Sequence, residues 1–253
     1  MITKIELDKL VEQYETVDFI KDDPIQFPHN YSNNQDIELA GFISSLFSYG
    51  NRKMFIKKLE EFFDYTNGEP CNFIKNGDFS IILKNNFNYR FSKPYEIVEL
   101  LQILSKLYNT TNGLSELFEY GYKVDNSIQS LFKVVIDYFY SNVSSNVGQG
   151  FYHLLPNPSK KGAMKRMCMF LRWMVRKSDV DLGIWSFMPK NELLMPLDVH
   201  VARLSREMNL LTRKSNDMNA VIELTNNLKY FDKDDPVKYD FAIFGKGIEE
   251  AYS

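Results

Sequence analysis

The sequence predicts an all-α fold. Apolar residues recur with helical spacing along most of the chain, as in residues 94–108, where Leu100, Leu101, Leu104 and Leu107 form one stripe. No segment shows the alternation of apolar and polar residues that is typical of a confident strand. The chain has 253 residues, of which 44% are hydrophobic, so it is long enough to bury a sizeable core.

The helices are expected in a definite order. Asn34 is a plausible cap for the strongly apolar helix that follows it, and Gly50-Asn51 breaks the pattern before the next helix. Pro236, directly after Asp235, suits the first turn of the last helix. The expected helices before that last one cover residues 2–14, 35–49, 52–65, 94–108, 114–122, 127–140, 162–176, 198–208 and 215–228. Residues 66–94 receive no assignment.

Size and pattern favour a single helical domain of residues 1–253, with two lobes around a cleft. We expect the lobes near residues 35–140 and 141–253, with the N-terminal helix packing on the second lobe. No internal repeat or low-complexity tract is evident.

Composition excludes several classes of protein. Cys71 and Cys168 are the only cysteines, too few for a four-cysteine zinc or iron–sulfur site. With only three histidines, a site built mostly on histidine is disfavoured, and we expect neither a metal nor a cofactor. No apolar run approaches a membrane span, and Glu6 interrupts what would be the apolar core of a signal peptide. The expectation is therefore a cytoplasmic monomer without a membrane partner.

The charge is unevenly distributed. Residues 138–178 contain no Asp or Glu and seven Lys and Arg residues, so this window carries +7 although the whole chain carries −3. The remainder therefore carries −10, and such asymmetry predicts a local positive field on an acidic body. A solvated helix face that happens to be basic would produce the same pattern. The basic residues are Lys160, Lys161, Lys165, Arg166, Arg172, Arg176 and Lys177.

The helix expected around residues 165–176 is amphipathic. Its apolar residues Met167, Phe170, Leu171, Met174 and Val175 share one face, and Lys165, Arg172 and Arg176 fall on the opposite side. The helix N-terminus, preceded by Lys160 and Lys161, would suit a DNA phosphate. The alternative is an ordinary amphipathic helix with a solvated basic back.

The motif Pro196-Leu197-Asp198-Val199-His200 places a carboxylate directly before a helical pattern. Asp198 stands where a helix N-cap is expected, a role worth roughly 1 kcal/mol. His200 in the first turn is a second candidate functional group, although a histidine at such a position is more often a surface or partly buried residue.

Together, the basic helix and the aspartate turn resemble the helix-hairpin-helix DNA glycosylase superfamily, in particular its 8-oxoguanine glycosylases. The segment Leu155-Pro156-Asn157-Pro158-Ser159 stands at the place of the hairpin. Lys165 stands at the place of the family's lysine, and Asp198 matches its aspartate turn. The segment from Leu39 to Asn51 is similar to the early helix, whose end pushes a side chain into the DNA stack, so Tyr49 and Asn51 are candidate DNA contacts.

A closer resemblance is to an uncharacterised bacterial family of conserved hypothetical proteins (domain of unknown function 2400). Three segments carry this resemblance: residues 170–176, the aspartate turn, and residues 235–242. Because the family is uncharacterised, this resemblance does not indicate an activity.

The chain departs from the glycosylase pattern in three ways. Asn157 and Ser159 stand where the hairpin would have glycines that approach a phosphate. Lys165 and Asp198 are 33 positions apart, a separation similar to that of the archaeal 8-oxoguanine branch. Lys161 is an alternative nucleophile if the alignment is anchored on Leu155-Pro156, and the iron–sulfur cysteines of some members are absent.

The resemblance implies base-excision repair of double-stranded DNA that contains a damaged base, such as an oxidised purine. Lys165 would attack the sugar as a neutral amine, and Asp198 would stabilise the developing positive charge. The implied DNA contacts are Lys160, Lys161, Arg166, Arg172, Tyr49, Asn51 and His200. Two alternatives remain open: a non-catalytic nucleic-acid-binding protein on the same scaffold, and an interaction protein whose basic helix meets an acidic partner.

Overall fold

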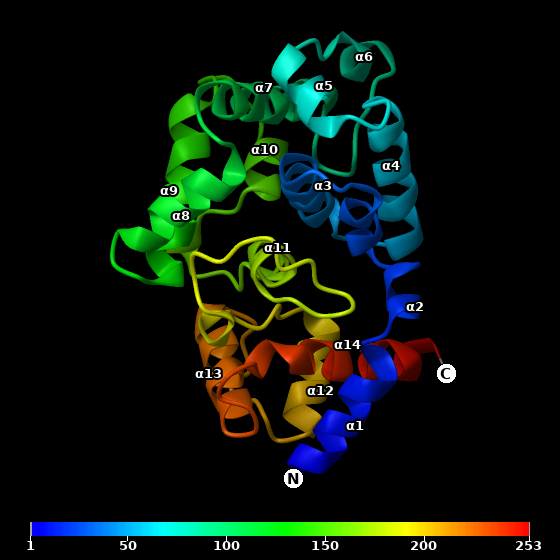
Figure 1. Ribbon diagram of the computed structural model, residues 1–253, viewed down its shortest axis with the longest axis vertical. Coiled ribbons are helices and arrows are strands. Elements are labelled where there is room, and N and C mark those ends of the chain that lie inside the picture. The colour runs from blue at the N-terminus through cyan, green and yellow to red at the C-terminus, as the bar shows by residue number, and fades with distance from the viewer. Residues whose placement is uncertain (1, 253) are drawn as a thin grey trace. The chain divides into compact units, whose positions relative to one another are not determined.

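The computed structural model describes the backbone of residues 2–252 and the side chains of residues 2–247. Helices connected by loops make up this part of the chain, and the only β-bridges in it are isolated (Figure 1). The expected all-α fold class is therefore confirmed. None of the described helices combines the length and the apolar composition that crossing a membrane requires.

The chain divides into two compact units. We call residues 24–158 the central unit, and residues 1–23 together with residues 159–253 the terminal unit. The elements of the central unit are η1 (Pro24–Gln26), η2 (Pro28–Asn30), α3 (Asn34–Phe47), α4 (Arg52–Asp64), α5 (Pro70–Asn76), α6 (Ser80–Lys84), α7 (Pro94–Thr110), α8 (Leu114–Lys123), α9 (Ile128–Asn142) and α10 (Gln149–Leu154). The remaining elements are α1 (Lys4–Tyr14), α2 (Val17–Ile20), η3 (Pro158–Lys160), α11 (Lys165–Val175), η4 (Lys190–Glu192), α12 (Val199–Glu207), α13 (Met218–Lys229), η5 (Pro236–Lys238) and α14 (Tyr239–Tyr252).

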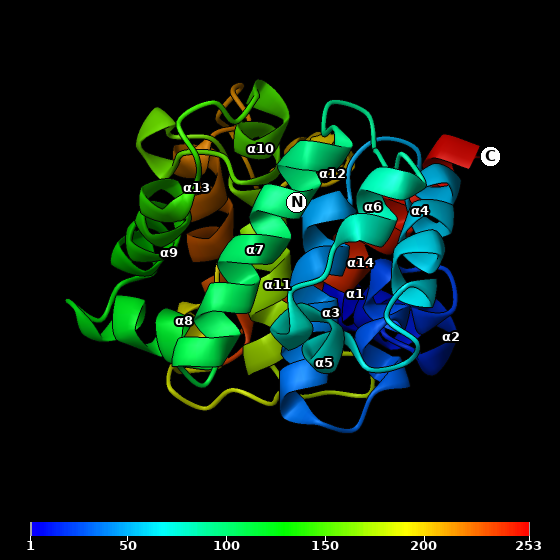
Figure 2. The same cartoon turned by 90° about the horizontal axis from the view of Figure 1, so that it is seen from above.

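The central unit is built on α3, which is buried along nearly its whole length. Asn33 rather than Asn34 caps α3, because its side chain accepts a hydrogen bond from Gln35 N–H. In the same unit, α8 packs along α9, and α5 and α6 pack on α7 (Figure 2). Buried Glu38 ties α3 to α8, because its carboxylate accepts hydrogen bonds from the backbone N–H groups of Leu114 and Ser115.

In the terminal unit, α1 and α12 both pack on α14, so the first and last helices of the chain lie side by side (Figure 1). Residues 167–175 of α11 are all buried. A helix that is buried on every side belongs to the interior of a fold rather than to its surface. This placement contradicts the alternative interpretation of α11 as an ordinary amphipathic helix with a solvated basic back.

The start of α11 differs from the sequence expectation for a local reason. Met164 has φ of 50° and Lys161 has φ of 57°, so both lie in the left-handed region and the helix begins at Lys165 instead of Gly162. The carbonyl oxygen of Lys161 accepts a hydrogen bond from Met218 N–H at 3.0 Å. That bond ties the loop before α11 to the start of α13.

The segment left unassigned from the sequence, residues 66–94, contains the short helices α5 and α6 and a tight turn in which Tyr89 pairs with Ser92. These elements are too short to repeat an apolar stripe, which is why periodicity did not reveal them.

Candidate lysine–aspartate site

The terminal unit brings Lys165 and Asp198 together. Lys165 Nζ lies 3.9 Å from Asp198 Oδ2, and the two side chains are 27% and 20% exposed. The distance falls within the range of about 3–6 Å that a nucleophile and its partner would need in a resting site. Lys165 is the first residue of α11, and Asp198 directly precedes α12.

The two oxygens of Asp198 have separate roles. Oδ1 accepts hydrogen bonds from the backbone N–H groups of His200 and Val201, both at 2.9 Å, and so caps α12. Oδ2 is the oxygen that faces Lys165. The capping bonds fix the carboxylate in place, so the second oxygen is held in a defined position beside the amine.

A buried ion-pair network lies next to this pair on the same helix. Arg172 and Arg176 are only 3% and 4% exposed. Arg172 Nε donates to Asp181 Oδ1 at 3.2 Å and Nη1 pairs with Asp240, while Arg176 pairs through Nη1 with Asp181 Oδ2 at 2.8 Å. Buried guanidinium groups require such partners, because an unpaired charge in the interior is costly.

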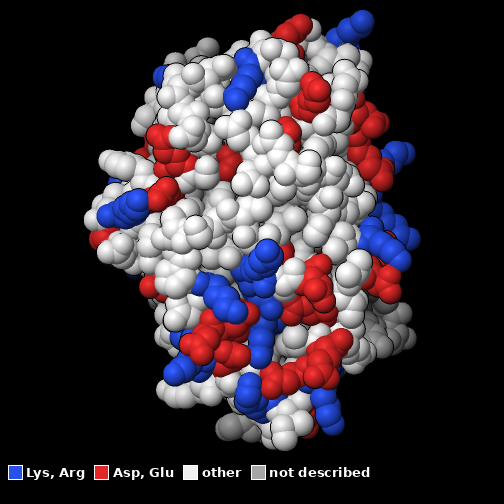
Figure 3. Space-filling view, viewed as in Figure 1, with Lys and Arg blue, Asp and Glu red and all other residues white. Residues whose placement is uncertain are grey.

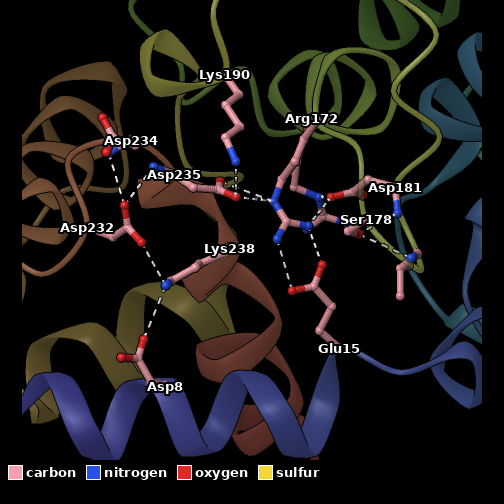
Figure 4. A network of polar contacts seen from close by, with 12 residues as sticks. Asp8, Glu15, Arg172, Ser178, Asp181, Lys190, Asp232, Asp234, Asp235 and Lys238 are labelled. Atoms are coloured by element: carbon pink, nitrogen blue, oxygen red, sulfur yellow. Dashed lines mark hydrogen bonds and ion pairs between the residues drawn. The ribbon is translucent and has the colours of Figure 1, made fainter.

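Further carboxylates surround Arg176. Its Nε lies 3.0 Å from Asp235 Oδ2, and its Nη2 lies 3.0 Å from Glu15 Oε2. Lys190 Nζ also reaches Asp235, at 3.1 Å (Figure 4). Burial alone would lower the pKa of Arg176, but the hydrogen bond to Glu15 and the neighbouring carboxylates raise it. Close to this network, Lys238 forms ion pairs with Asp8 and Asp232 (Figure 4).

This network corrects the DNA-binding role expected for Arg172. The helical wheel placed Arg172 opposite the apolar face correctly, but that side of α11 meets carboxylates of the protein instead of solvent. Arg172 also lies over the Phe241 ring, 4.2 Å from its centroid. The positive charge of Arg172 is therefore balanced by carboxylates of the protein itself, and the same holds for Arg176. The positive window seen in the sequence is partly neutralised, and acidic and basic side chains alternate over this unit (Figure 3).

Asp240 is a residue of the site that the sequence did not reveal. Burial raises the pKa of its carboxyl to about 7, and the Asp198 carboxylate adds to this effect, whereas Arg172 and Lys165 oppose it. The two arginines face the four carboxylates of Glu15, Asp181, Asp235 and Asp240, so negative charge is in excess and retention of a proton is favoured. In the sequence, the only indication that Asp240 matters was its position in residues 235–242, one of the segments that resemble the uncharacterised family.

The remaining candidates of the terminal unit lie at or near the start of α11 and α12. Lys160 and Lys161 are exposed, and Arg166 and His200 are partly buried. Lys160 and Lys161 lie in η3 and the following loop, just before Lys165. These two lysines therefore remain available to an anion outside the protein.

Tyr49 and Asn51 belong to the central unit. Asn51 is exposed and caps α4, with Oδ1 accepting from Met54 N–H at 3.2 Å. Tyr49 is partly buried, and between the two residues Gly50 has φ of +88°. The predicted DNA-wedging turn is thus the tight connection between α3 and α4.

Fold and site together define an all-helical protein that carries a partly exposed lysine–aspartate pair beside a buried ion-pair network. The chain belongs to a family of proteins of unknown function, DUF2400, which it matches over residues 23–249. This match confirms the resemblance to the uncharacterised family that the sequence indicated, whereas the resemblance to the DNA glycosylase superfamily remains a prediction. No curated protein and no solved structure matches the chain.

The three segments that carried the family resemblance supply the core of the site. Residues 170–176 hold the two buried arginines, the aspartate turn holds Asp198, and residues 235–242 hold Asp235 and Asp240. The first and third segments therefore supply the buried ion pairs of the terminal unit, and the second supplies the carboxylate of the lysine–aspartate pair.

Proposed function

We propose that this protein is a DNA base-excision enzyme of the helix-hairpin-helix glycosylase type, with Lys165 as nucleophile and Asp198 as its carboxylate partner. The observation that carries the proposal is the distance of 3.9 Å between Lys165 Nζ and Asp198 Oδ2 in a partly exposed setting. Because Oδ1 is bound to the start of α12, Oδ2 is held toward the amine, which is the arrangement that the proposed chemistry requires.

The proposed reaction begins with the amine of Lys165 in its neutral form. Its nitrogen attacks C1′ of the damaged nucleotide, and the bond from C1′ to the base breaks with the electron pair leaving on the base, which takes up a proton. The nitrogen lone pair then opens the C1′–O4′ bond, whose electron pair leaves on O4′ and takes up a proton from solvent, and a protonated imine forms between Lys165 and the sugar. The target nucleotide must first leave the base stack, because the sugar–base bond is inaccessible within a duplex.

Asp198 contributes electrostatically. Positive charge develops on the sugar as the base leaves, and a carboxylate fixed nearby stabilises it without having to reorganise. Oδ1 remains bound to the N–H groups of α12, so Oδ2 is the atom that faces the reacting centre. The exposed Lys160 and Lys161 would hold a backbone phosphate close to Lys165.

The test is borohydride trapping on duplexes that contain 8-oxoguanine, other oxidised bases or an abasic site. The proposal predicts a covalent protein–DNA adduct that Lys165→Gln removes and Lys161→Gln retains. If the duplexes bind with a strong salt dependence but no adduct forms on any of them, the non-catalytic nucleic-acid-binding alternative replaces this proposal. Absence of nucleic-acid binding even at low salt would favour an acidic protein partner.

A further inference from the structure

The central unit carries an exposed group of rings around one guanidinium. His153 lies 4.7 Å from Tyr49 and 4.8 Å from Phe91, measured between ring centroids. The Arg90 guanidinium carbon lies 5.7 Å from the centroids of the same two rings. We call these four residues, Tyr49, Arg90, Phe91 and His153, the aromatic–arginine cluster. They come from three separate segments of the chain.

A tight turn presents two members of the cluster. Tyr89 N–H donates to Ser92 O at 3.0 Å and Ser92 N–H donates to Tyr89 O at 2.9 Å, which leaves Arg90 and Phe91 at the tip. Arg90 has φ of 50°, a conformation that costs free energy for a residue with a long side chain. Ser92 Oγ donates to Gly150 O at 3.1 Å and thereby anchors the turn to α10, the helix that carries His153.

The rings and the guanidinium are held in place rather than loosely arranged. The hydroxyl of Tyr49 donates to Tyr89 O, and the hydroxyl of Tyr89 donates to Tyr49 O, so the two tyrosines lock each other. Gly50 leaves room for the Arg90 guanidinium, because a Cβ atom at Gly50 would overlap it. Within the part of the chain that the structure describes, Arg90 forms no ion pair with a carboxylate.

One ring of the cluster is open to solvent. Phe91 is 59% exposed, although a phenyl ring is normally buried. Flat rings beside a cation suit unpaired nucleobases, which stack on aromatic side chains while a guanidinium approaches the strand's phosphates. Paired bases inside a duplex do not offer their faces in this way.

We propose that the aromatic–arginine cluster is a binding site for the unpaired bases of single-stranded nucleic acid. The proposal concerns the central unit alone and does not require chemistry at Lys165. Failure of the proposed glycosylase activity would therefore leave it untouched.

The experiment measures binding of the full chain to a short fluorescent oligothymidylate, to an abasic strand of the same length, and to a duplex. Stacking of a base on an aromatic side chain is worth about 1–3 kcal/mol, so Phe91→Ala should weaken oligothymidylate binding by a factor of about 5 to 150. The same variant should leave binding of the abasic strand unchanged, because that strand has no base to stack. Tyr120→Ala is the matched control, since Tyr120 is a 65% exposed ring elsewhere in the central unit.

A pair of glycine variants tests the placement of Arg90. Gly50→Ala should weaken oligothymidylate binding because it displaces the guanidinium. Gly68→Ala imposes similar backbone strain, with φ of +79°, but its Cβ would meet nothing within 4 Å, so binding should stay at the wild-type level. Circular dichroism of each variant reports whether it is folded, and Arg90→Gln tests the charge without touching either glycine.

Equal oligothymidylate affinity of Phe91→Ala, Arg90→Gln and the wild type would overturn the proposal. So would an equal loss of affinity for the oligothymidylate, the abasic strand and the duplex, because that pattern would show a phosphate-binding surface without base stacking. Repeating the measurement with Lys165→Gln, which should bind the oligothymidylate normally, separates this site from the proposed glycosylase site.

Discussion

Lys165 and Asp198 face each other across 3.9 Å, with one carboxylate oxygen turned toward the amine and the other bound to the start of α12. The aspartate therefore has a structural role and a candidate chemical role at the same time. Substitutions can separate the two roles, because asparagine retains a capping oxygen and loses the charge.

Asp198→Asn should leave stability nearly unchanged and reduce lesion cleavage at least about 100-fold, since it removes the charge that stabilises the transition state. Asp198→Ala should show the same loss of cleavage and also cost about 1 kcal/mol, or roughly 2–4 °C in melting temperature, because the cap is lost. Thermal unfolding and single-turnover cleavage measure the two effects. Full cleavage by Asp198→Asn would show that the carboxylate acts only as a cap.

Arg172→Met should lower the free energy of unfolding by about 3–5 kcal/mol, because buried Asp240 loses its arginine partner and buried Asp181 keeps only Arg176. Arg203→Met is the control: Arg203 is 43% exposed and pairs with Glu207 on the surface, so the expected cost is at most about 1 kcal/mol. Urea denaturation compares the two variants. Equal stability of both would refute a structural role for the network.

The stability of the terminal unit should depend on pH through Asp240. The folded-state pKa of about 7 is above the ordinary value of 3.8, so the folded protein holds the proton more tightly than the unfolded chain. This contribution to stability is fully present below about pH 4, is lost progressively as the pH rises to about 7, and then stays constant.

Asp240→Asn removes this titration. The stability of the variant minus that of the wild type should rise between pH 4 and 7, by at most about 1.4 kcal/mol per pH unit. The lost pairing with Arg172 shifts the difference by a constant but does not change its slope over this range. Denaturation curves at several pH values measure it, and a difference that is independent of pH would contradict the raised pKa.

Lys160→Gln and Lys161→Gln should each weaken duplex binding and reduce the slope of log affinity against log salt by about 0.9, because one phosphate contact is lost. Lys233→Gln, at an exposed lysine elsewhere in the terminal unit, is the control and should change neither quantity. Fluorescence anisotropy across a salt series provides the measurement. Identical slopes for all four proteins would exclude Lys160 and Lys161 from the interface.

Periodicity predicted the longer helices well because their apolar stripes face a core. The stripe of residues 94–108 became α7 (Pro94–Thr110), with only its last residues missed. The start of α11 was wrong by three residues because the sequence does not reveal the left-handed backbone at Met164. The short elements between residues 66 and 94 carry too few residues to establish a period.

The candidate site was only partly accessible from the sequence. The position of Asp198 before a helical pattern predicted a cap, and Asp198 is indeed the cap of α12. Its meeting with Lys165 was expected only through a family resemblance, because contacts between residues far apart in sequence leave no local pattern. The helical wheel showed the side of α11 on which Arg172 lies, but it could not show the carboxylates packed against that side.

The most direct test of the central claim is mass spectrometry of the borohydride-reduced protein–DNA adduct after proteolysis. We predict that the sugar remnant is attached to Nζ of Lys165 and that Asp198→Asn greatly reduces the yield of this peptide. Attachment at Lys161 or another lysine, or no modified peptide from any lesion-containing duplex, would contradict the account.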